Sequence, residues 1–250
     1  MCGRYVITSA PEAIRRLFGY LDQPNFPPRY NVAPTQGVPI VRLTEGKRQF
    51  ALVRWGLIPS WVKDPRAFSL LINARGETVN EKPAFRNAMK RRRCLFPADG
   101  FYEWKKEGGR KRVYFVRKKS GGPMALAGLW ETWTGPNGEE QETAAIVTTK
   151  ANQTCAAIHD RMPMILEPAD YDLWLDCANV DTETAAALIR PAPDGLLEIY
   201  EVSPAANRVA NDSPALLEPA IETPAVSATE SKKPAAKPRR KKDTGQASLF

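Results

Sequence analysis

The second residue of the chain carries the groups best suited to covalent chemistry. Once Met1 is removed, Cys2 becomes the N-terminus and presents an α-amine and a thiol on adjacent carbons. The amine titrates at about pH 7.7–8.0 and the thiol at about 8.5, so both are partly nucleophilic at neutral pH. The thiol could attack a carbonyl with the amine as base, or the amine could condense with an aldehyde before the thiol closes a thiazolidine ring. Gly3 gives access to this group, and Arg4 supplies a nearby cation.

Three polar residues could assist such chemistry, although each also has a purely structural reading. His159, the only histidine, lies in the polar loop before MPMIL, where a general acid or base is often found. Glu103 lies in FYEWK, an expected strand whose alternation places it on the face opposite Tyr102 and Trp104, and aromatic surroundings would raise its pKa. Asn73, in LLINARGET, offers an amide for a carbonyl or hydroxyl oxygen. The structural alternatives are a loop histidine, an exposed glutamate on an edge strand and an asparagine that caps the backbone.

The other cysteines favour a reduced, unexported protein without metal or cofactor. Cys94, Cys155 and Cys177 are widely scattered and form no C-x-x-C pair, so we expect neither zinc nor disulfides. Each is interpreted as a small buried apolar residue. The N-terminus lacks the pattern of a signal peptide, and no apolar run approaches the roughly 20 residues of a membrane helix. We therefore expect a cytoplasmic, nucleoid-associated protein, and a monomer because no apolar seam suggests a dimer.

Strands outnumber helices and do not alternate regularly with them, which predicts how the reactive residues are positioned. VPIVRL and QFALVRW, separated by TEGK, read as a hairpin, and CLFPA and FYEWKK as strands on either side of Asp99-Gly100. Ser9 and Glu12 form a candidate capping box for a helix through Phe18. The sequence therefore predicts an α+β fold with a mixed, curved or barrel-like β-sheet core and peripheral helices.

A change in composition near residue 220 predicts a domain of residues 1–220 followed by a disordered basic tail of residues 221–250. The net charge is +8, of which the domain contributes only +4, so binding of an acidic partner there requires local clustering of cations. The tail contains KKPAAKPRRKK, which fits a solvated segment, added nonspecific DNA affinity or a nuclear import signal.

The chain ends in QASLF, which resembles the Gln-x-Ser/Asp-Leu-Phe peptide of bacterial repair proteins that bind the replicative sliding clamp. Leu249 and Phe250 are the only large apolar residues of the distal tail, as expected of anchors for a partner's pocket. Gln246, Leu249 and Phe250 are therefore the candidate clamp-binding residues.

Several segments in order resemble the motifs of the SOS response-associated peptidase family: MCGRY, RYNVAPTQ, RWGLIPSWVKD, INARGET, RRCLFPADGFYEWK, AGLWE, VTTKAN, HDRMPMIL and VSPAANRVAND. They extend from residue 2 to about residue 212. The resemblance implies a DNA-repair protein that binds abasic sites in single-stranded DNA and joins to them covalently. It implies thiazolidine formation at Cys2, a lyase-type activity, and a site completed by Asn73, Glu103 and His159.

The resemblance also implies DNA contacts. Arg4, Arg75, Arg86 and Arg161 lie in or beside the matched motifs and are expected to bind phosphates, whereas Trp61 and Pro34 would stack on or wedge between bases. Four phosphate contacts predict a salt slope of roughly −3. The alternatives are ion-paired or solvated arginines and a core tryptophan.

Three other functions fit the N-terminal cysteine or the tail. A chain that begins Met-Cys-Gly could be an N-terminal-nucleophile amidohydrolase, such as a glutamine amidotransferase. Cys2 could instead cleave peptides, in the mildest form by removing Met1 itself. The third alternative is a non-catalytic DNA-binding adaptor tethered to the clamp.

Overall fold

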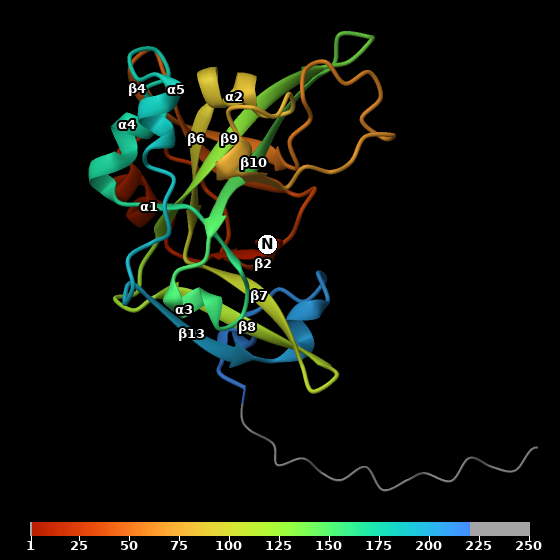
Figure 1. The fold of residues 1–250 in the computed structure, drawn as a ribbon, viewed down its shortest axis with the longest axis vertical. Helices are drawn as coiled ribbons and strands as arrows, with labels where there is room; N and C mark the ends of the chain where they lie inside the picture. The colour runs from red at the N-terminus through yellow and green to blue at the C-terminus, as the bar shows by residue number, and fades with distance from the viewer. Residues whose placement is uncertain (1, 221–250) are drawn as a thin grey trace, which may run out of the picture. The chain divides into compact units, whose positions relative to one another are not determined.

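A closed ring of five strands forms the larger part of the fold. The computed structural model describes residues 2–220, and Figure 1 shows their arrangement. The ring closes because β10 pairs with β4 on one side and with β9 on the other. Its strands, in the order of their pairing, are β10 (Glu140–Lys150), β4 (Lys47–Trp55), β3 (Gly37–Thr44), β6 (Arg93–Ala98) and β9 (Met124–Thr134). The barrel-like core expected from the sequence is confirmed.

Three short strands lie beside this ring. Within the described residues, β5 pairs in parallel with β10, while β11 and β12 pair antiparallel with β10 and β9. They are β5 (Asn73–Arg75), β11 (Arg161–Pro163) and β12 (Ile165–Leu166). Through β5 and β11, the strand β10 receives segments that lie more than 80 residues apart in the sequence.

A second sheet of five strands packs against the ring. Its order is β13 (Leu197–Val202), β8 (Arg110–Lys118), β7 (Gly100–Glu107), β1 (Tyr5–Ile7) and β2 (Arg29–Val32). The buried ring of Tyr5 in β1 lies edge-on to Trp55 of β4, with 5.4 Å between the ring centroids, and also contacts Phe96 of β6. This aromatic cluster packs the N-terminal strand of the second sheet against the ring.

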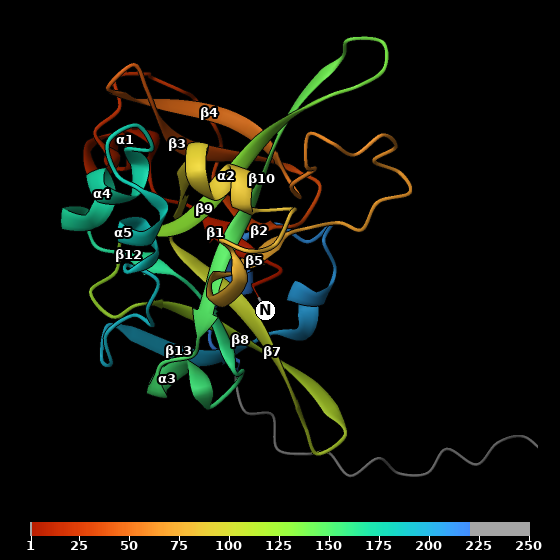
Figure 2. The ribbon, with the colours of Figure 1, turned by 45° about the horizontal axis from the view of Figure 1, so that its top comes forward.

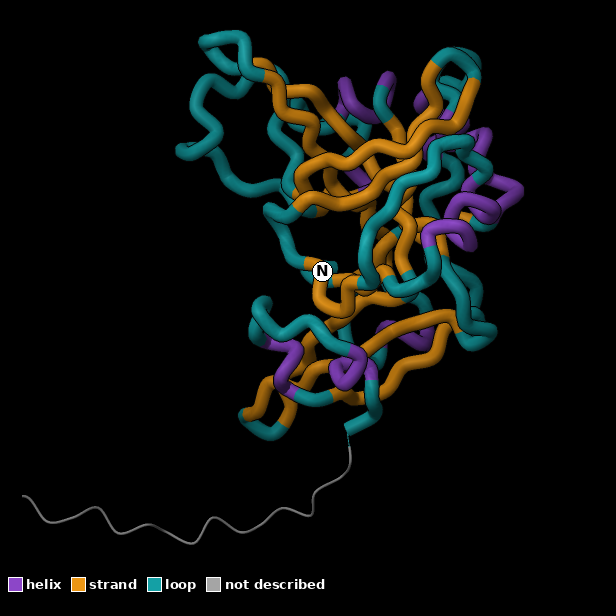
Figure 3. Tube along the Cα trace, turned by 180° about the vertical axis from the view of Figure 1, so that it is seen from behind, coloured by secondary structure: helices purple, strands orange, loops and turns teal. Residues whose placement is uncertain are grey.

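The helices are short and lie along the outside of the sheets, as Figure 3 shows. The α-helices are α1 (Pro11–Phe18), α2 (Arg86–Arg91), α3 (Gln153–Ala156), α4 (Tyr171–Leu175) and α5 (Thr182–Ala186). Four 3₁₀ turns accompany them: η1 (Gly76–Thr78), η2 (Pro168–Asp170), η3 (Pro204–Asn207) and η4 (Pro214–Leu217). No helix in residues 2–220 is long and apolar enough to cross a membrane.

Of two local predictions, the β3–β4 hairpin is confirmed and the capping box before α1 is wrong. The β3–β4 hairpin turns at Glu45-Gly46, inside the predicted TEGK segment. The capping box before α1 is wrong, because Ala10 rather than Ser9 is the N-cap and no side chain caps the helix. The Ser9 hydroxyl instead hydrogen-bonds to the carboxylate of Asp99, which also accepts from the main-chain N–H groups of Thr8 and Ser9.

Candidate functional site

Pairing of β1 with β7 places the N-terminus beside Glu103. Tyr5 pairs with Phe101, and the main-chain N–H of Tyr102 donates to the carbonyl oxygen of Arg4 across 3.0 Å. Since the strands are antiparallel, each residue before Arg4 lies beside a residue after Tyr102. The register therefore brings Gly3 and Cys2 alongside Glu103 and Trp104, and Figure 2 shows β7 passing close to the N-terminal end of the chain.

Asn73 contacts Cys2 directly from the opposite side. Its strand, β5, pairs in parallel with β10, where Asn73 lies opposite Ile146. The side-chain amide of Asn73 donates to the main-chain carbonyl oxygen of Cys2 across 2.9 Å. The amide oxygen, Oδ1, is buried and accepts no hydrogen bond from the residues that the structure describes. A buried acceptor of this kind is available to a hydroxyl or amine donor brought by a substrate.

Glu103 provides a buried carboxyl group in the same region. Only 3% of its surface is exposed, and burial raises its pKa, while the positive form of His159 acts in the opposite direction. Its charge in turn contributes to raising the pKa of the Cys2 thiol, after the larger effect of burial. Glu103 is therefore coupled electrostatically to both Cys2 and His159.

His159 is oriented by the main chain that follows it. It lies in the turn between α3 and β11, and its Nδ1 accepts the main-chain N–H of Arg161 across 2.9 Å. The carboxylate of Asp160 also lies 2.9 Å from Nδ1. Nδ1 thus contacts both a main-chain N–H and a carboxylate, and these two contacts fix the orientation of the ring.

The Cys2 thiol is fully buried, which the sequence did not predict. Burial raises its pKa well above the ordinary value, so the thiol is neutral at physiological pH. Cys155 is also buried, and burial together with the Glu103 charge raises its pKa to about 12. Cys94 is buried as predicted, but the same prediction for Cys177 is wrong, because Cys177 is partly exposed at the end of α4. The proximity of Cys155 to Glu103 had no signal in the sequence.

Two of the four arginines expected at phosphates are held by internal partners. The guanidinium of Arg4 is buried and donates to Asn31 Oδ1 across 2.6 Å and to the carbonyl oxygen of Ala206 across 3.0 Å. Asn31 also donates to the carbonyl oxygens of Arg208 and Asn211, so this cluster fixes the segment around η3 against β2. Asn31 lies in the RYNVAPTQ motif, but no pattern in the sequence indicates its partners.

Arg161 is held even more firmly. The Arg161 guanidinium donates to both carboxylate oxygens of Glu77, at 2.5 and 2.9 Å, and to the carbonyl oxygen of Thr148 across 2.7 Å. These bonds join η1 and β10 to β11, so they connect the segment after Asn73 with the segment after His159. Glu77 was missed in the sequence, although it lies in the same INARGET motif as Asn73.

The other expected DNA contacts lie at the surface. Arg75 and Arg86 are exposed, Pro34 is half-buried, and Trp61 is 57% exposed with its ring edge-on to Phe68. Trp61 and Arg86 line one groove of about 550 Å³ between the loop after β4 and the start of α2. An exposed indole beside a guanidinium is a surface to which a base and a phosphate can bind together.

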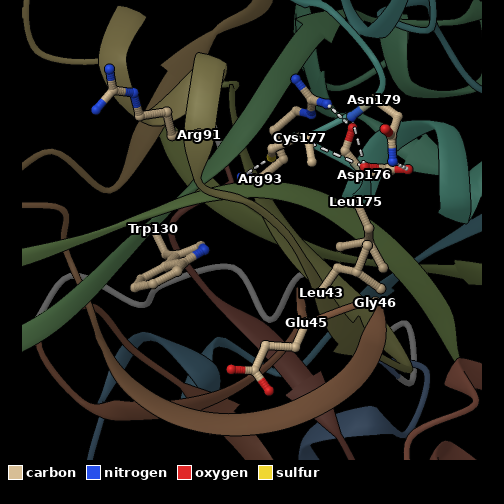
Figure 4. A pocket seen from close by; sticks show the side chains of 11 residues that line it. Leu43, Glu45, Gly46, Arg91, Arg93, Trp130, Leu175, Asp176, Cys177 and Asn179 are labelled. Carbon is tan, nitrogen blue, oxygen red and sulfur yellow. Dashed lines mark hydrogen bonds between the residues drawn. The ribbon is translucent and has the colours of Figure 1, made fainter.

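A separate hollow of about 430 Å³ opens near α4, and Arg93 is among the residues that line it (Figure 4). Arg93 donates from its buried guanidinium to the carbonyl oxygens of Trp174, Asp176 and Val180. The main-chain N–H of Arg93 also lies 3.5 Å from the Cys177 sulfur. Figure 4 shows Arg91 pointing away from this cluster. The Arg93 hydrogen bonds hold α4 and the following turn in place.

Known proteins resemble the chain over nearly all of the described residues. Abasic site processing protein YoqW of Bacillus subtilis is 38% identical over 222 residues, which cover 87% of this chain and 99% of that protein. Abasic site processing protein HMCES of Xenopus tropicalis is 31% identical over 93% of this chain and 83% of its own length. A crystal structure of a protein from Bacteroides thetaiotaomicron superimposes with a TM-score of 0.79 at 26% identity, covering 88% of this chain and all of that one. The sequence model of the SOS response associated peptidase (SRAP) family matches residues 1–209, and the chain belongs to that family.

Proposed function

We propose that the protein recognises abasic sites in single-stranded DNA and joins to them through a thiazolidine ring formed by Cys2. The observation that carries this proposal is the hydrogen bond from Asn73 to the Cys2 carbonyl, with the buried Glu103 coupled to both Cys2 and His159. Relatives named as abasic site processing proteins support the choice of substrate.

The buried thiol suggests the order of the steps. Since the pKa of the Cys2 thiol is raised by burial, the thiolate is scarce, and the α-amine exposed by removal of Met1 is the first nucleophile. The amine nitrogen adds to the aldehyde carbon of the opened sugar, and the adduct loses one water to give an imine. The thiol sulfur then adds to the same carbon while its proton passes to nitrogen. The ring thus forms with net loss of one water and no redox change.

Each remaining residue has a role in proton transfer or positioning. An abasic sugar is mainly a closed hemiacetal, and its opening requires one proton to leave the anomeric hydroxyl and one to reach the ring oxygen. Glu103, whose pKa is raised by burial, and His159 exchange these protons. Asn73 holds the Cys2 main chain through its amide nitrogen and presents Oδ1 to a sugar hydroxyl or to the amine. The same steps in reverse release the protein.

The test is to incubate the protein with single-stranded DNA that contains an abasic site and to analyse the product on a denaturing gel. A denaturation-resistant band is expected from the wild type and from Cys177→Ala, a matched control at the partly exposed thiol. Cys2→Ala should give no band, and a band of wild-type intensity from this variant would refute the proposal. Mass spectrometry of the N-terminal peptide should show a sugar remnant on Cys2.

The family is named for a peptidase, so hydrolysis of an amide by Cys2 is a second activity to test. An N-terminal-nucleophile amidohydrolase or peptidase would use the Cys2 thiol against an amide, for which a raised pKa is unfavourable. Such an enzyme would leave Cys2 unmodified after exposure to abasic DNA and would release product from a peptide or from glutamine. An adaptor without catalysis would leave Cys2 unmodified and release nothing.

The partner proposed for the C-terminus is the bacterial sliding clamp. Gln246, Leu249 and Phe250 lie outside the described residues, so this proposal rests on the sequence alone. Removal of residues 246–250 should abolish clamp binding in a pull-down and leave crosslinking intact, whereas retained clamp binding would contradict it. We also propose that the protein acts as a monomer, which sedimentation at several concentrations would test.

A further inference from the structure

One hairpin carries a dense cluster of positive charge. Residues 105–112, KKEGGRKR, contain five Lys/Arg and one Glu, hence a net charge of +4. Residues 1–220 contain 29 Lys/Arg and 25 Asp/Glu, which is also +4. The rest of the domain is therefore neutral in sum. A second basic segment, residues 86–93, contains five Lys/Arg and no acid, but its Arg93 is buried and its Arg92 is paired with Glu131. The hairpin is the basic segment whose cations continue from Glu103, and it attracts a polyanion bound there.

The same hairpin is continuous with the candidate site. Glu103 of β7 lies opposite Tyr114 of β8, Lys105 lies opposite Arg112, and Glu107 lies opposite Arg110. Because side chains alternate along a strand, these three pairs share one face. Each pair lies about 7 Å beyond the one before. A chain with regularly spaced phosphates that starts at Glu103 would therefore meet Lys105 and Arg112 first, then Arg110.

The hairpin projects beyond its neighbours, with its tip to the lower right in Figures 1 and 2. Its base is anchored on the face opposite Glu103. The indole N–H of Trp104 donates to Asn207 across 2.8 Å, and the hydroxyl of Tyr102 donates to the carbonyl oxygen of Tyr30. The Lys111 ammonium lies 5.1 Å from the Trp104 ring. The hairpin is thus a supported arm, and Lys106, Arg110 and Lys111 are exposed along it.

The ion pairs on the arm are ones that a phosphate can replace. Glu107 lies 3.1 Å from Lys105 and 3.4 Å from Arg112, and Glu201 lies 3.3 Å from Arg112. All of these side chains are at least a third exposed, and pairs of that kind contribute about 0–1 kcal/mol. Contacts of Lys and Arg with DNA phosphates gain in addition from the release of counterions.

We propose that the β7–β8 hairpin is a second DNA-binding element, which holds the phosphates of one arm of the single strand next to the abasic site through Lys105, Arg112 and Arg110. The inference deepens the proposed function and uses residues outside the candidate site. Because the hairpin extends in one direction from Glu103, it contacts the strand on one side of the lesion only.

The test measures binding apart from covalent chemistry. The ligand is single-stranded DNA with a tetrahydrofuran abasic analogue, which has no aldehyde, and the readout is fluorescence anisotropy at several salt concentrations. Lys105→Ser/Arg112→Ser should reduce the salt slope by about 1.4, two contacts at roughly 0.7 each. The matched control is Lys118→Ser/Lys119→Ser, which removes the same charge about 20 Å away at the other end of the strand. An equal loss in both variants would show an effect of net charge alone and would overturn the inference.

Shortened oligonucleotides complete the test. Removal of the nucleotides on one side of the analogue should abolish the difference between wild type and the hairpin variant, whereas removal on the other side should preserve it. A difference that depends equally on both sides would contradict the inference. Crosslinking is measured separately at saturating DNA, where the variant should react at the wild-type rate. A wild type that binds through the hairpin but never crosslinks would refute the proposed function and leave the hairpin inference standing.

Discussion

The side-chain amide of Asn73 donates to the main-chain carbonyl oxygen of Cys2 across 2.9 Å, and its own oxygen stays without a partner among the described residues. One side chain thereby holds Cys2 through its main-chain carbonyl, and not through the amine or the thiol that we propose to react. The arrangement separates positioning from chemistry, and the two can be perturbed one at a time.

Asn73→Ala should slow crosslinking roughly 5–150-fold, because it leaves a buried carbonyl without its donor at a cost of about 1–3 kcal/mol. The rate is measured by quenching samples over time and separating the adduct on a denaturing gel. Asn73→Asp is the matched variant of the same shape, and it lacks the amide donor. A wild-type rate in both variants would show that the hydrogen bond has no role.

Cys2→Ser should separate the two nucleophiles. The serine amine can still form an imine, but a hydroxyl closes a less stable ring than a thiol does. We therefore expect an adduct that survives denaturation only when borohydride is present during the reaction. A borohydride-independent adduct of wild-type yield would argue against a thiazolidine, and its absence with borohydride would argue against the amine as first nucleophile.

Glu103→Gln should stabilise the fold at neutral pH while it impairs crosslinking. Burial raises the pKa of Glu103, so the stability linked to its protonated form is present below the unfolded value of about 4.3 and lost as pH rises through the folded pKa. Glutamine does not lose a proton. The melting temperature of the Glu103→Gln variant should therefore exceed that of the wild type at pH 8. This difference in melting temperature should disappear below about pH 4.3. A lower melting temperature at pH 8 would mean that Glu103 stabilises the fold.

Arg161→Ala should act on stability more than on DNA affinity. The variant loses the bonds to Glu77 and Thr148, which we expect to cost about 1–3 kcal/mol in denaturant unfolding. The Arg161 guanidinium lowers the pKa of Glu77, so stability from this pair is present above about pH 4.3 and lost as pH falls through the folded pKa. The difference from wild type should shrink in acid. A reduced salt slope with unchanged stability would assign Arg161 to a phosphate instead.

The sequence predicted those parts of the fold that nearby residues determine. Alternation placed Glu103 on a strand, and the turn residues around Glu45-Gly46 defined the β3–β4 hairpin. The capping box failed because the Ser9 hydroxyl is bound by Asp99, 90 residues away. A local pattern cannot report a partner at that separation, since the same residues satisfy both arrangements.

The candidate site was likewise predictable from the sequence only in part. Residue types and motifs singled out Cys2, Asn73, Glu103 and His159, but not the contact between Asn73 and Cys2, which depends on parallel pairing of β5 with β10. The internal partners of Arg4 and Arg161 were equally invisible, because an arginine that binds a phosphate and one that binds protein oxygens look alike in sequence. The exposure of Cys177 depends on where α4 ends against Arg93.

The burial of Cys2 has a consequence for how the protein is made. Cys2 is among the first residues to be synthesised, whereas Glu103, beside which it is packed, follows about 100 residues later. At roughly 5–20 residues per second, this leaves on the order of 5–20 s during which the N-terminus is accessible. For the proposed chemistry, an external aminopeptidase has to remove Met1 within that interval, before folding encloses Cys2. If it does not, the folded protein has to cleave the Met1–Cys2 bond itself, so we expect the rate of translation to affect the fraction of molecules with a free Cys2 amine.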